Sequence, residues 1–148
     1  MLDSVYNSKI IEFAGNIERI GILESFDVSA KAHSKLCGST VEVYLKSEGN
    51  RVTDFSHTVK ACALGQASSS IMARVIIGST FEELRSLRDM MSKMLKENGP
   101  PPDGKFSDFA FLEPVRDYRA RHASTLLTFD AVVDCLDQIE ANELSAVT

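Results

Sequence analysis

The sequence lacks any apolar stretch long enough to cross a membrane. A membrane-spanning helix needs about 20 consecutive apolar residues, whereas the longest apolar runs, such as residues 75–77, extend over only a few positions. The N-terminal segment also lacks a basic region followed by an apolar one, and it carries Asp3, Glu12 and Glu18. Because secretory signals show that basic and then apolar order, we expect a cytoplasmic protein with no membrane partner.

Positive charge is also scarce. The chain has 16 lysine and arginine residues against 21 aspartate and glutamate residues, which gives a formal net charge of −5 at pH 7. No dense stripe of basic residues with interleaved aromatic side chains offsets this balance. Because a polyanion repels a negatively charged chain at long range, the sequence argues against binding of nucleic acid or of acidic membranes.

Cysteine is rare, and Cys37, Cys62 and Cys135 are the whole complement. An odd number of cysteines in a chain without an export signal favours reduced thiols over a disulfide framework. The rest of the composition is ordinary, since 44% of the 148 residues are hydrophobic and 25% are charged. These values exclude disordered and disulfide-scaffold classes and, at this length, predict a single domain over residues 1–148.

Apolar residues at helical spacing predict a first helix over residues 2–20. The residues that follow this spacing of three and four are Tyr6, Ile10, Phe13, Ile17 and Ile20. Asp3 or Ser4 is available to cap the N-terminus of this helix. We expect the helix to end near Gly15 or Gly21.

Alternating patterns after this helix predict three strands. A weak alternation over residues 26–36 is compatible with an edge strand. A clearer alternation over residues 41–45 is followed by turn-forming residues at 48–50 and by a second apolar run over residues 52–59. This order predicts an antiparallel hairpin.

Two helices are predicted after the hairpin. The first follows Cys62, contains many small residues and ends at Gly78. The second begins with a capping box formed by Thr80 and Glu83. Its apolar stripe, over residues 84–95, predicts one buried face.

The last third of the chain completes the predicted fold. The proline-rich stretch of residues 100–104 cannot continue a helix and predicts a surface loop. A short packed segment over residues 106–112 and an amphipathic helix over residues 123–141 follow it. The predicted class is therefore α+β: a small three-stranded antiparallel sheet packed by one N-terminal helix and several C-terminal helices.

The three cysteines occupy different kinds of position. Cys37 precedes Gly38 in a predicted loop, where glycine permits a sharp turn beside the thiol. Cys62 lies where a strand meets a helix, so unpaired N–H groups and the helix dipole favour a thiolate that acts as nucleophile or ligand. Both cysteines also suit buried packing positions, since free cysteine is often buried. Cys135 lies among core residues of the last helix and is predicted to belong to the core.

The histidines offer one further candidate ligand. His33 and His57 lie on predicted strands, where each suits a position on the sheet surface. His122 precedes the last helix and suits either a capping or surface role or a ligand role. Cys37, Cys62 and His122 are far apart in sequence, unlike the paired ligands of a zinc finger. All three lie at element junctions, and two thiolates with an imidazole would suit zinc or iron.

Three segments resemble the motifs of the NifU/IscU-like iron–sulfur cluster assembly scaffold family. They are KLCGS at residues 35–39, CALGQASSS at residues 62–70 and RHASTL at residues 121–126. The likeness extends from the first predicted helix to the last, and residues 80–98 with the proline loop are similar to the insertion of the SufU-type branch. The resemblance implies that family's fold and a scaffold or sulfur and metal carrier, rather than an enzyme with catalytic residues.

The chain departs from the family motifs at two positions. Ser39 stands where the family has an aspartate after Cys-Gly, and Ala123 stands at the position of the third cysteine. The resemblance therefore assigns Cys37 and Cys62 as ligands of a metal or cluster. It also assigns His122, which matches the histidine that precedes the third cysteine in IscU-type members.

The resemblance implies a transient cargo and named partners. Four thiolates, or a mixed set with histidine, normally hold a [2Fe-2S] cluster, so a fourth donor would be water, Asp117, an external thiol or a second subunit. Three protein ligands and an open position also suit zinc. The implied partners are a cysteine desulfurase, which would pass a persulfide to Cys62 or Cys37, and apo-acceptor proteins.

Two other functions compete with the carrier. Loss of two ligand positions is compatible with a docking module that binds cysteine desulfurase or target proteins without metal. Alternatively, Cys62 activated by His122 would make a cysteine-nucleophile enzyme, which needs a positioned base and an oxyanion hole that the sequence does not demonstrate. Metal content that disappears with Cys37→Ala or Cys62→Ala separates the carrier from both.

Overall fold

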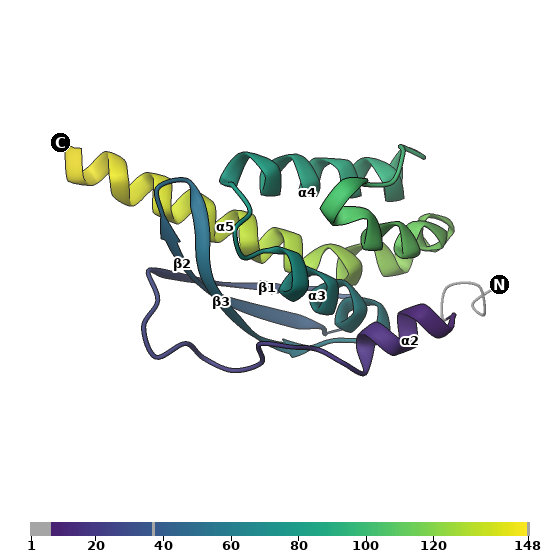
Figure 1. The fold of residues 1–148 in the computed structure, drawn as a ribbon. Helices are drawn as coiled ribbons and strands as arrows, with labels where there is room; N and C mark the ends of the chain where they lie inside the picture. Colours follow the sequence, from purple (N-terminus) through teal and green to yellow (C-terminus); the bar gives the residue numbers. More distant parts are fainter. Residues whose placement is uncertain (1–6, 37, 148) are drawn as a thin grey trace.

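A computed structural model describes residues 7–36 and 38–147 of the chain, and Figure 1 shows its α+β order. The elements are α2 (Ser8–Ala14), β1 (Val28–His33), β2 (Thr40–Glu48), β3 (Arg51–Lys60), α3 (Ala63–Val75), α4 (Phe81–Lys96), the 3₁₀ helices η1 (Gly104–Asp117) and η2 (Arg119–Arg121), and α5 (His122–Val147). This order confirms the predicted fold class. Within the described ranges, no helix combines the length and the apolar character that a membrane span requires.

The sheet has the strand order β1-β2-β3, and both neighbouring pairs are antiparallel. The predicted hairpin and the predicted edge strand β1 are therefore both confirmed. Gly49 adopts a φ of 62° in the hairpin turn, a backbone conformation that glycine reaches without strain. The alternation along β2 places Val41, Val43 and Leu45 in the core, where none of the three is exposed to solvent.

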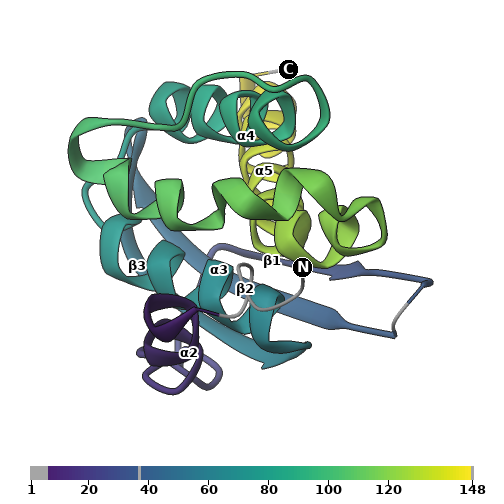
Figure 2. The ribbon, with the colours of Figure 1, turned by 90° about the vertical axis from the view of Figure 1, so that its right-hand side faces the viewer.

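Helices cover one face of the sheet in two layers, as Figures 1 and 2 show. The long helix α5 contacts β1 and β2, and α3 contacts β3 and α5. Above them, α4 packs on α5, and η1 packs on α4 and α3. The rings of Phe109 in η1 and Phe129 in α5 lie 4.9 Å apart between their centroids, which joins the two helical layers.

The N-terminal helix begins with a side-chain cap. Asn7 Oδ1 accepts hydrogen bonds from the backbone N–H groups of Lys9 and Ile10 at 3.0 and 3.1 Å. The two caps predicted from the sequence, Asp3 and Ser4, lie outside the described residues.

The same helix ends at Ala14, at the earlier of the two predicted ends. The following segment pairs with the free edge of β3 instead: His57 N–H donates to Arg19 O at 3.1 Å, and Gly21 N–H donates to His57 O at 2.9 Å. Ile20, expected on the buried face of a longer helix, is 57% exposed. Hydrogen bonding to an open sheet edge has therefore outweighed the helical spacing.

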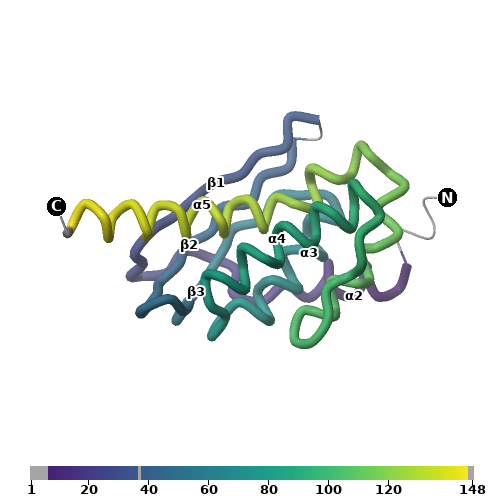
Figure 3. Tube along the Cα trace, turned by 90° about the horizontal axis from the view of Figure 1, so that it is seen from above, coloured from purple at the N-terminus to yellow at the C-terminus, as the bar shows by residue number. Residues whose placement is uncertain are grey.

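Helix α5 continues beyond its predicted end at Ala141 to Val147. Residues 141–146 are exposed, with Leu144 70% exposed. Figure 3 shows this end of α5 running past the sheet. An exposed helical segment has no buried face, so apolar periodicity gives no sign of it.

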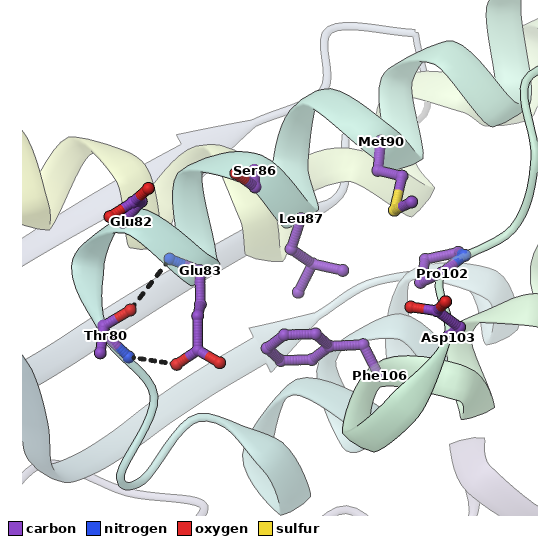
Figure 4. Close-up of a pocket in the computed structure, with 9 residues that line it drawn as sticks. All are labelled: Thr80, Glu82, Glu83, Ser86, Leu87, Met90, Pro102, Asp103 and Phe106. Carbon is purple, nitrogen blue, oxygen red and sulfur yellow. Dashed lines mark hydrogen bonds between the residues drawn. The ribbon is translucent and has the colours of Figure 1, made fainter.

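The capping box of α4 forms as predicted, and Figure 4 shows it beside a cavity of about 280 Å³. Glu83 N–H donates to Thr80 Oγ1 at 3.1 Å, and Thr80 N–H donates to the Glu83 carboxylate at 2.8 Å. Leu87 and Phe106 form apolar parts of the cavity lining between α4 and η1. This cavity lies along the first half of α4, whereas the cleft described below lies at the end of that helix.

Candidate functional site

The strand register brings two of the predicted junctions to one end of the sheet. Thr40 pairs with His33 on β1 and with Lys60 on β3. The turn between β1 and β2 therefore lies beside the end of β3, two residues before Cys62. Cys37 itself lies outside the described residues, so its place in the site stays a prediction.

Around that position the turn is closed by backbone hydrogen bonds. Ser34 N–H donates to Ser39 O at 2.8 Å, and Gly38 N–H donates to Ser34 O at 2.9 Å. Gly38 has a φ of 70°, so this tight turn depends on glycine. Ser39, which replaces the aspartate of the family motif, is buried.

Cys62 is the N-cap residue of α3 and is half-buried. Its backbone is extended, and its side chain forms no capping hydrogen bond to the helix. The thiol instead donates to Ser124 Oγ over 3.5 Å, and Ser124 Oγ donates to Arg121 O over 3.2 Å. The start of α3 and the first turn of α5 therefore meet at the Cys62 sulfur.

Small residues allow α3 and α5 to approach this closely. A Cβ atom built on Gly65 would lie 3.1 Å from Ser124 O and 2.7 Å from the Ala61 Cβ, so a larger residue would separate the helices. One turn later, Ser68 Oγ donates to Thr125 O at 2.7 Å. The small-residue pattern predicted a helix, but no local pattern indicated that Ser124 is the residue that contacts Cys62.

His122 is the first residue of α5 and is 7% exposed. Its Nε2 atom lies 3.0 Å from Val115 O and 3.1 Å from Arg116 O. Because a carbonyl oxygen only accepts hydrogen bonds, we assign the proton to Nε2, which leaves the lone pair of neutral imidazole on Nδ1. Backbone contacts of this kind fix the tautomer and orientation of histidine ligands in metal sites.

A cleft opens beside His122 at the start of α5. It is bounded by the end of α4, by the η1–η2 region and by α5, and its lining residues are Leu95, Lys96, Asn98, Arg116, Asp117, Arg119, His122 and Ala123. Asp117, which the sequence offered as a fourth donor, therefore shares this cleft with His122. Ala123 is exposed there and has no donor atom in its side chain.

Over residues 7–36 and 38–147, no group of three histidine, cysteine, aspartate or glutamate side chains is arranged to hold a metal ion. The structure places Cys62 and His122 at the first turn of α5. The Cys62 thiol contacts Ser124 in that turn, and His122 is the first residue of the helix. A thiol and an imidazole with a free lone pair are suitable donors for zinc or iron. The third predicted ligand, Cys37, lies outside these residues.

Cys135 has the core position that the sequence predicted. It is completely buried, and its sulfur lies 3.8 Å from Val43 O. Burial, with a smaller effect of the Asp134 carboxylate, raises the pKa of the Cys135 thiol to about 12. This thiol is unsuited to bind metal or to accept sulfur at neutral pH.

The two remaining histidines differ from each other. His33 is exposed on β1, as the sequence predicted. For His57 the expected surface position is wrong, because the residue is completely buried beneath the segment after α2. Its Nε2 lies 2.9 Å from Glu18 O, its Nδ1 has no hydrogen-bond partner, and burial lowers its pKa.

Two relatives found by sequence comparison are similar to this chain over most of its length. An iron–sulfur cluster assembly scaffold protein named IscU from Thermotoga maritima is 29% identical over 136 residues, which are 91% of this chain and 94% of that protein. The zinc-dependent sulfurtransferase SufU of Bacillus subtilis is 24% identical over 131 residues, 88% of each chain.

Two solved structures share the fold of this chain. The N-terminal part of a nitrogen-fixing NifU-like protein from Brucella abortus is 66% identical, with a TM-score of 0.93 over 95% of this chain and 97% of that chain. A protein from Fervidobacterium islandicum, described as a scaffold for the SUF system, shares the fold at 21% identity, with a TM-score of 0.82 over 89% and 96% of the two chains. The family model of the NifU-like N-terminal domain matches residues 5–125. The chain therefore belongs to the NifU-like N-terminal domain family.

Proposed function

We propose that the chain is a scaffold or carrier that receives sulfur and metal during iron–sulfur cluster assembly. The relatives named as an assembly scaffold and as a zinc-dependent sulfurtransferase support this function. The structural observation that carries it is the contact of the half-buried Cys62 thiol with Ser124, beside the first turn of α5. The same turn holds His122, so a soft and a nitrogen donor lie at the ends of two packed helices.

The proposed donor set is Cys37, Cys62 and His122. Cys62 is the N-cap residue of α3, so the backbone N–H groups of the first helical turn, which have no partner within the helix, follow it directly. Ser124 Oγ accepts a hydrogen bond from the thiol, and its hydroxyl can donate to the sulfur once the thiol has lost its proton. His122 would bind through Nδ1, while Nε2–H stays on the carbonyl oxygens.

The cargo is a [2Fe-2S] cluster, an iron ion or a zinc ion held for a limited time. Three protein donors leave one coordination position for a further ligand, so the cargo is less firmly held than with four cysteines. Such a site suits a protein that hands its cargo to an acceptor. The chain has no catalytic residues in this proposal, because its thiols bind and pass on a group.

The proposed partners are a cysteine desulfurase and apo-acceptor proteins. In the transfer step, the Cys62 or Cys37 thiolate attacks the terminal sulfur of the desulfurase persulfide. A new S–S bond forms on the carrier, the S–S bond of the desulfurase breaks, and the desulfurase cysteine leaves as a thiolate. No external oxidant or reductant is needed.

Anaerobic assembly tests this function. The metal-free protein is incubated with ferrous iron, L-cysteine, a cysteine desulfurase and dithiothreitol, which reduces persulfide sulfur to sulfide. The visible absorption of a cluster and its transfer to an apo-ferredoxin are then followed. We expect a cluster in the wild type and in His33→Ala, and no cluster in Cys62→Ala. Formation of the same amount of cluster in Cys62→Ala would contradict the proposed site.

One observation favours the docking module as the second candidate. The two replaced motif positions hold Ser39 and Ala123, and neither side chain can bind iron or zinc as the family aspartate and cysteine would. A wild type that binds the desulfurase but forms no cluster and takes up no zinc would support this second function and overturn the first.

A further inference from the structure

A basic cleft lies at the start of α5, although the whole chain is acidic. Its charged lining residues are Lys96, Arg116 and Arg119 with a single carboxylate, Asp117, while the chain carries a formal charge of −5. In the described part of the chain, the side chains of Lys96 and Arg119 take part in none of the ion pairs or hydrogen bonds. A concave surface with unpaired charges of one sign attracts a ligand of the opposite sign.

The guanidinium of Arg116 is also incompletely paired within the chain. Its Nη2 atom lies 3.3 Å from Glu113 Oε2 and donates to Gly99 O at 3.3 Å. Its Nε–H group is buried and has no acceptor. A buried donor without an acceptor is unfavourable, so an anion near this side chain would stabilise it electrostatically.

The charges along α5 run against its helix dipole. The helix has no acidic residue in its first turn and no basic residue in its last turn. It contains no lysine or arginine, and its carboxylates come later, at Asp130, Asp134, Asp137, Glu140 and Glu143. Because negative charge stabilises the N-terminus of a helix and destabilises its C-terminus, helix stability does not explain this order. The positive end of the dipole instead adds to the positive potential of the cleft.

The cleft borders the contact through which the proposed carrier would receive sulfur. Ala123 lines the cleft and is exposed there, and the next residue, Ser124, accepts the hydrogen bond of the Cys62 thiol. A protein that passes sulfur to Cys62 would therefore cover the first turn of α5 and with it the neighbouring cleft. Complementary charge at that place would both attract and orient such a partner.

We propose that the cleft docks an acidic segment of the cysteine desulfurase that donates the sulfur. This inference rests on the proposed carrier function. Carboxylates of that segment pair with the exposed side chains of Lys96 and Arg119, and the charge of Arg116 adds to the attraction. The carboxylates further along α5 repel the same segment, so one orientation of the partner is favoured. The docking is electrostatic and forms no covalent bond.

The first test measures peptide binding to the metal-free protein by NMR chemical-shift titration. The probes are an end-blocked peptide of alternating aspartate and glutamate, the same peptide with asparagine and glutamine, and inorganic phosphate as a free anion. We expect the acidic peptide to shift the amide signals of residues 96–98 and 116–123 and the uncharged peptide to leave them unchanged. Phosphate should bind at least about tenfold more weakly, because it makes fewer ion pairs. Equal or tighter binding of phosphate would assign the cleft to a free anion and overturn the proposal.

Charge variants test the surface itself. The double variant Lys96→Gln with Arg119→Gln should weaken binding of the acidic peptide by at least about fivefold. The matched control, Lys31→Gln with Lys93→Gln, makes the same change in net charge at two exposed lysines that do not line the cleft. It should bind the peptide like the wild type. No loss in the first double variant, or an equal loss in both, would overturn the docking site.

The second test measures sulfur transfer from the desulfurase. Desulfurase loaded with radiolabelled sulfur is mixed with the wild type or with either double variant, and the label on the chain is followed over time. We expect the variant at Lys96 and Arg119 to accept sulfur at least about fivefold more slowly at low salt, and the difference to shrink at about 0.5 M salt. Cluster assembly from ferrous iron and sodium sulfide, which needs no desulfurase, should be unchanged.

The outcomes separate the docking site from the carrier function. Sulfur transfer at the wild-type rate in the variant at Lys96 and Arg119 would overturn the docking site and leave the carrier function intact. An equal loss of assembly with sulfide in that variant would place the two side chains in the cluster site and overturn their docking role. A wild type that accepts no sulfur and forms no cluster with sulfide would overturn both.

Discussion

The first turn of α5 and the middle of the same helix give cysteine opposite environments. At the first turn, the Cys62 thiol stays half-buried and contacts the hydroxyl of Ser124. In the middle, Cys135 is completely buried against β2, and burial raises the pKa of its thiol to about 12. Cys62 contacts the start of α5 and Cys135 belongs to the middle of that helix, so position in the fold decides which thiol is available for chemistry.

The largest expected effect is a difference in alkylation. In a Cys37→Ser background at pH 8, iodoacetamide should label Cys62 and leave Cys135 unlabelled in the folded protein. A thiol with a pKa of about 12 is ionised to only about one part in ten thousand at pH 8. In urea-unfolded protein the thiol has the ordinary cysteine pKa of about 8.5, and because the thiolate is the reacting form, Cys135 should react about 1000-fold faster there. Mass spectrometry of tryptic peptides measures both rates, and equal labelling of Cys135 in both states would remove the contrast.

A second cysteine at the first turn of α5 tests whether a metal binds beside Cys62. Ser124→Cys places a second sulfur where Ser124 Oγ now contacts Cys62, whereas Ala123→Cys places it on the exposed cleft side. We expect Ser124→Cys to raise zinc affinity at least about tenfold over the wild type, provided that the protein is kept reduced. Chelator competition measures this for Ser124→Cys and for Ala123→Cys, which restores the family's third cysteine, with Lys93→Cys, exposed on α4, as the matched control. No gain from either Ser124→Cys or Ala123→Cys would contradict a metal site at this turn.

The variant Gly65→Ala tests whether the close packing of α3 on α5 forms the Cys62 site. Gly65→Ala places a Cβ 3.1 Å from Ser124 O and 2.7 Å from the Ala61 Cβ, so we expect a loss of about 1–3 kcal/mol in the free energy of unfolding. Gly15→Ala is the control, since its Cβ would lie 3.4 Å from the nearest atom, Ile11 O, and it should change stability by less than about 0.5 kcal/mol. Urea denaturation measures both, and equal stability of the two variants would contradict the packing argument.

The smallest expected effect concerns the other buried histidine, His57. Burial lowers its pKa below the ordinary 6.5, so the unfolded chain binds more protons than the folded chain at mildly acidic pH. The stabilisation from neutral His57 is therefore complete above about pH 6.5 and is lost as pH falls below it. Urea denaturation at pH 7.5 and 5.5 should show this loss, and it should be smaller in His57→Gln; the control His33→Gln, exposed on β1, should keep the full loss.

Local sequence signals predicted those parts of the fold that depend on neighbouring residues. The capping box of Thr80 and Glu83 and the hairpin turn at Gly49 depend on residues a few positions apart, so both could be found from the sequence. The burial of Cys135 followed from apolar neighbours at helical spacing.

Long-range contacts could not be predicted in this way. His57 is buried because the segment around Arg19, which is far away in sequence, pairs with the edge of β3. The contact between Cys62 and Ser124 likewise joins residues that are 62 positions apart. The family resemblance supplied the candidate ligands, but only the packing of α3 on α5 shows which side chain faces the Cys62 sulfur.

Metal content is the most direct test of the proposed donor set. Zinc and iron are measured by elemental analysis in protein purified without chelator, for the wild type and for Cys37→Ala, Cys62→Ala and His122→Ala, with Cys135→Ala as the control. We predict close to one equivalent of metal in the wild type and in the control, and loss of metal in the other three variants. A wild type that is free of metal and cannot be loaded with zinc or iron, or variants that keep their metal, would contradict the account.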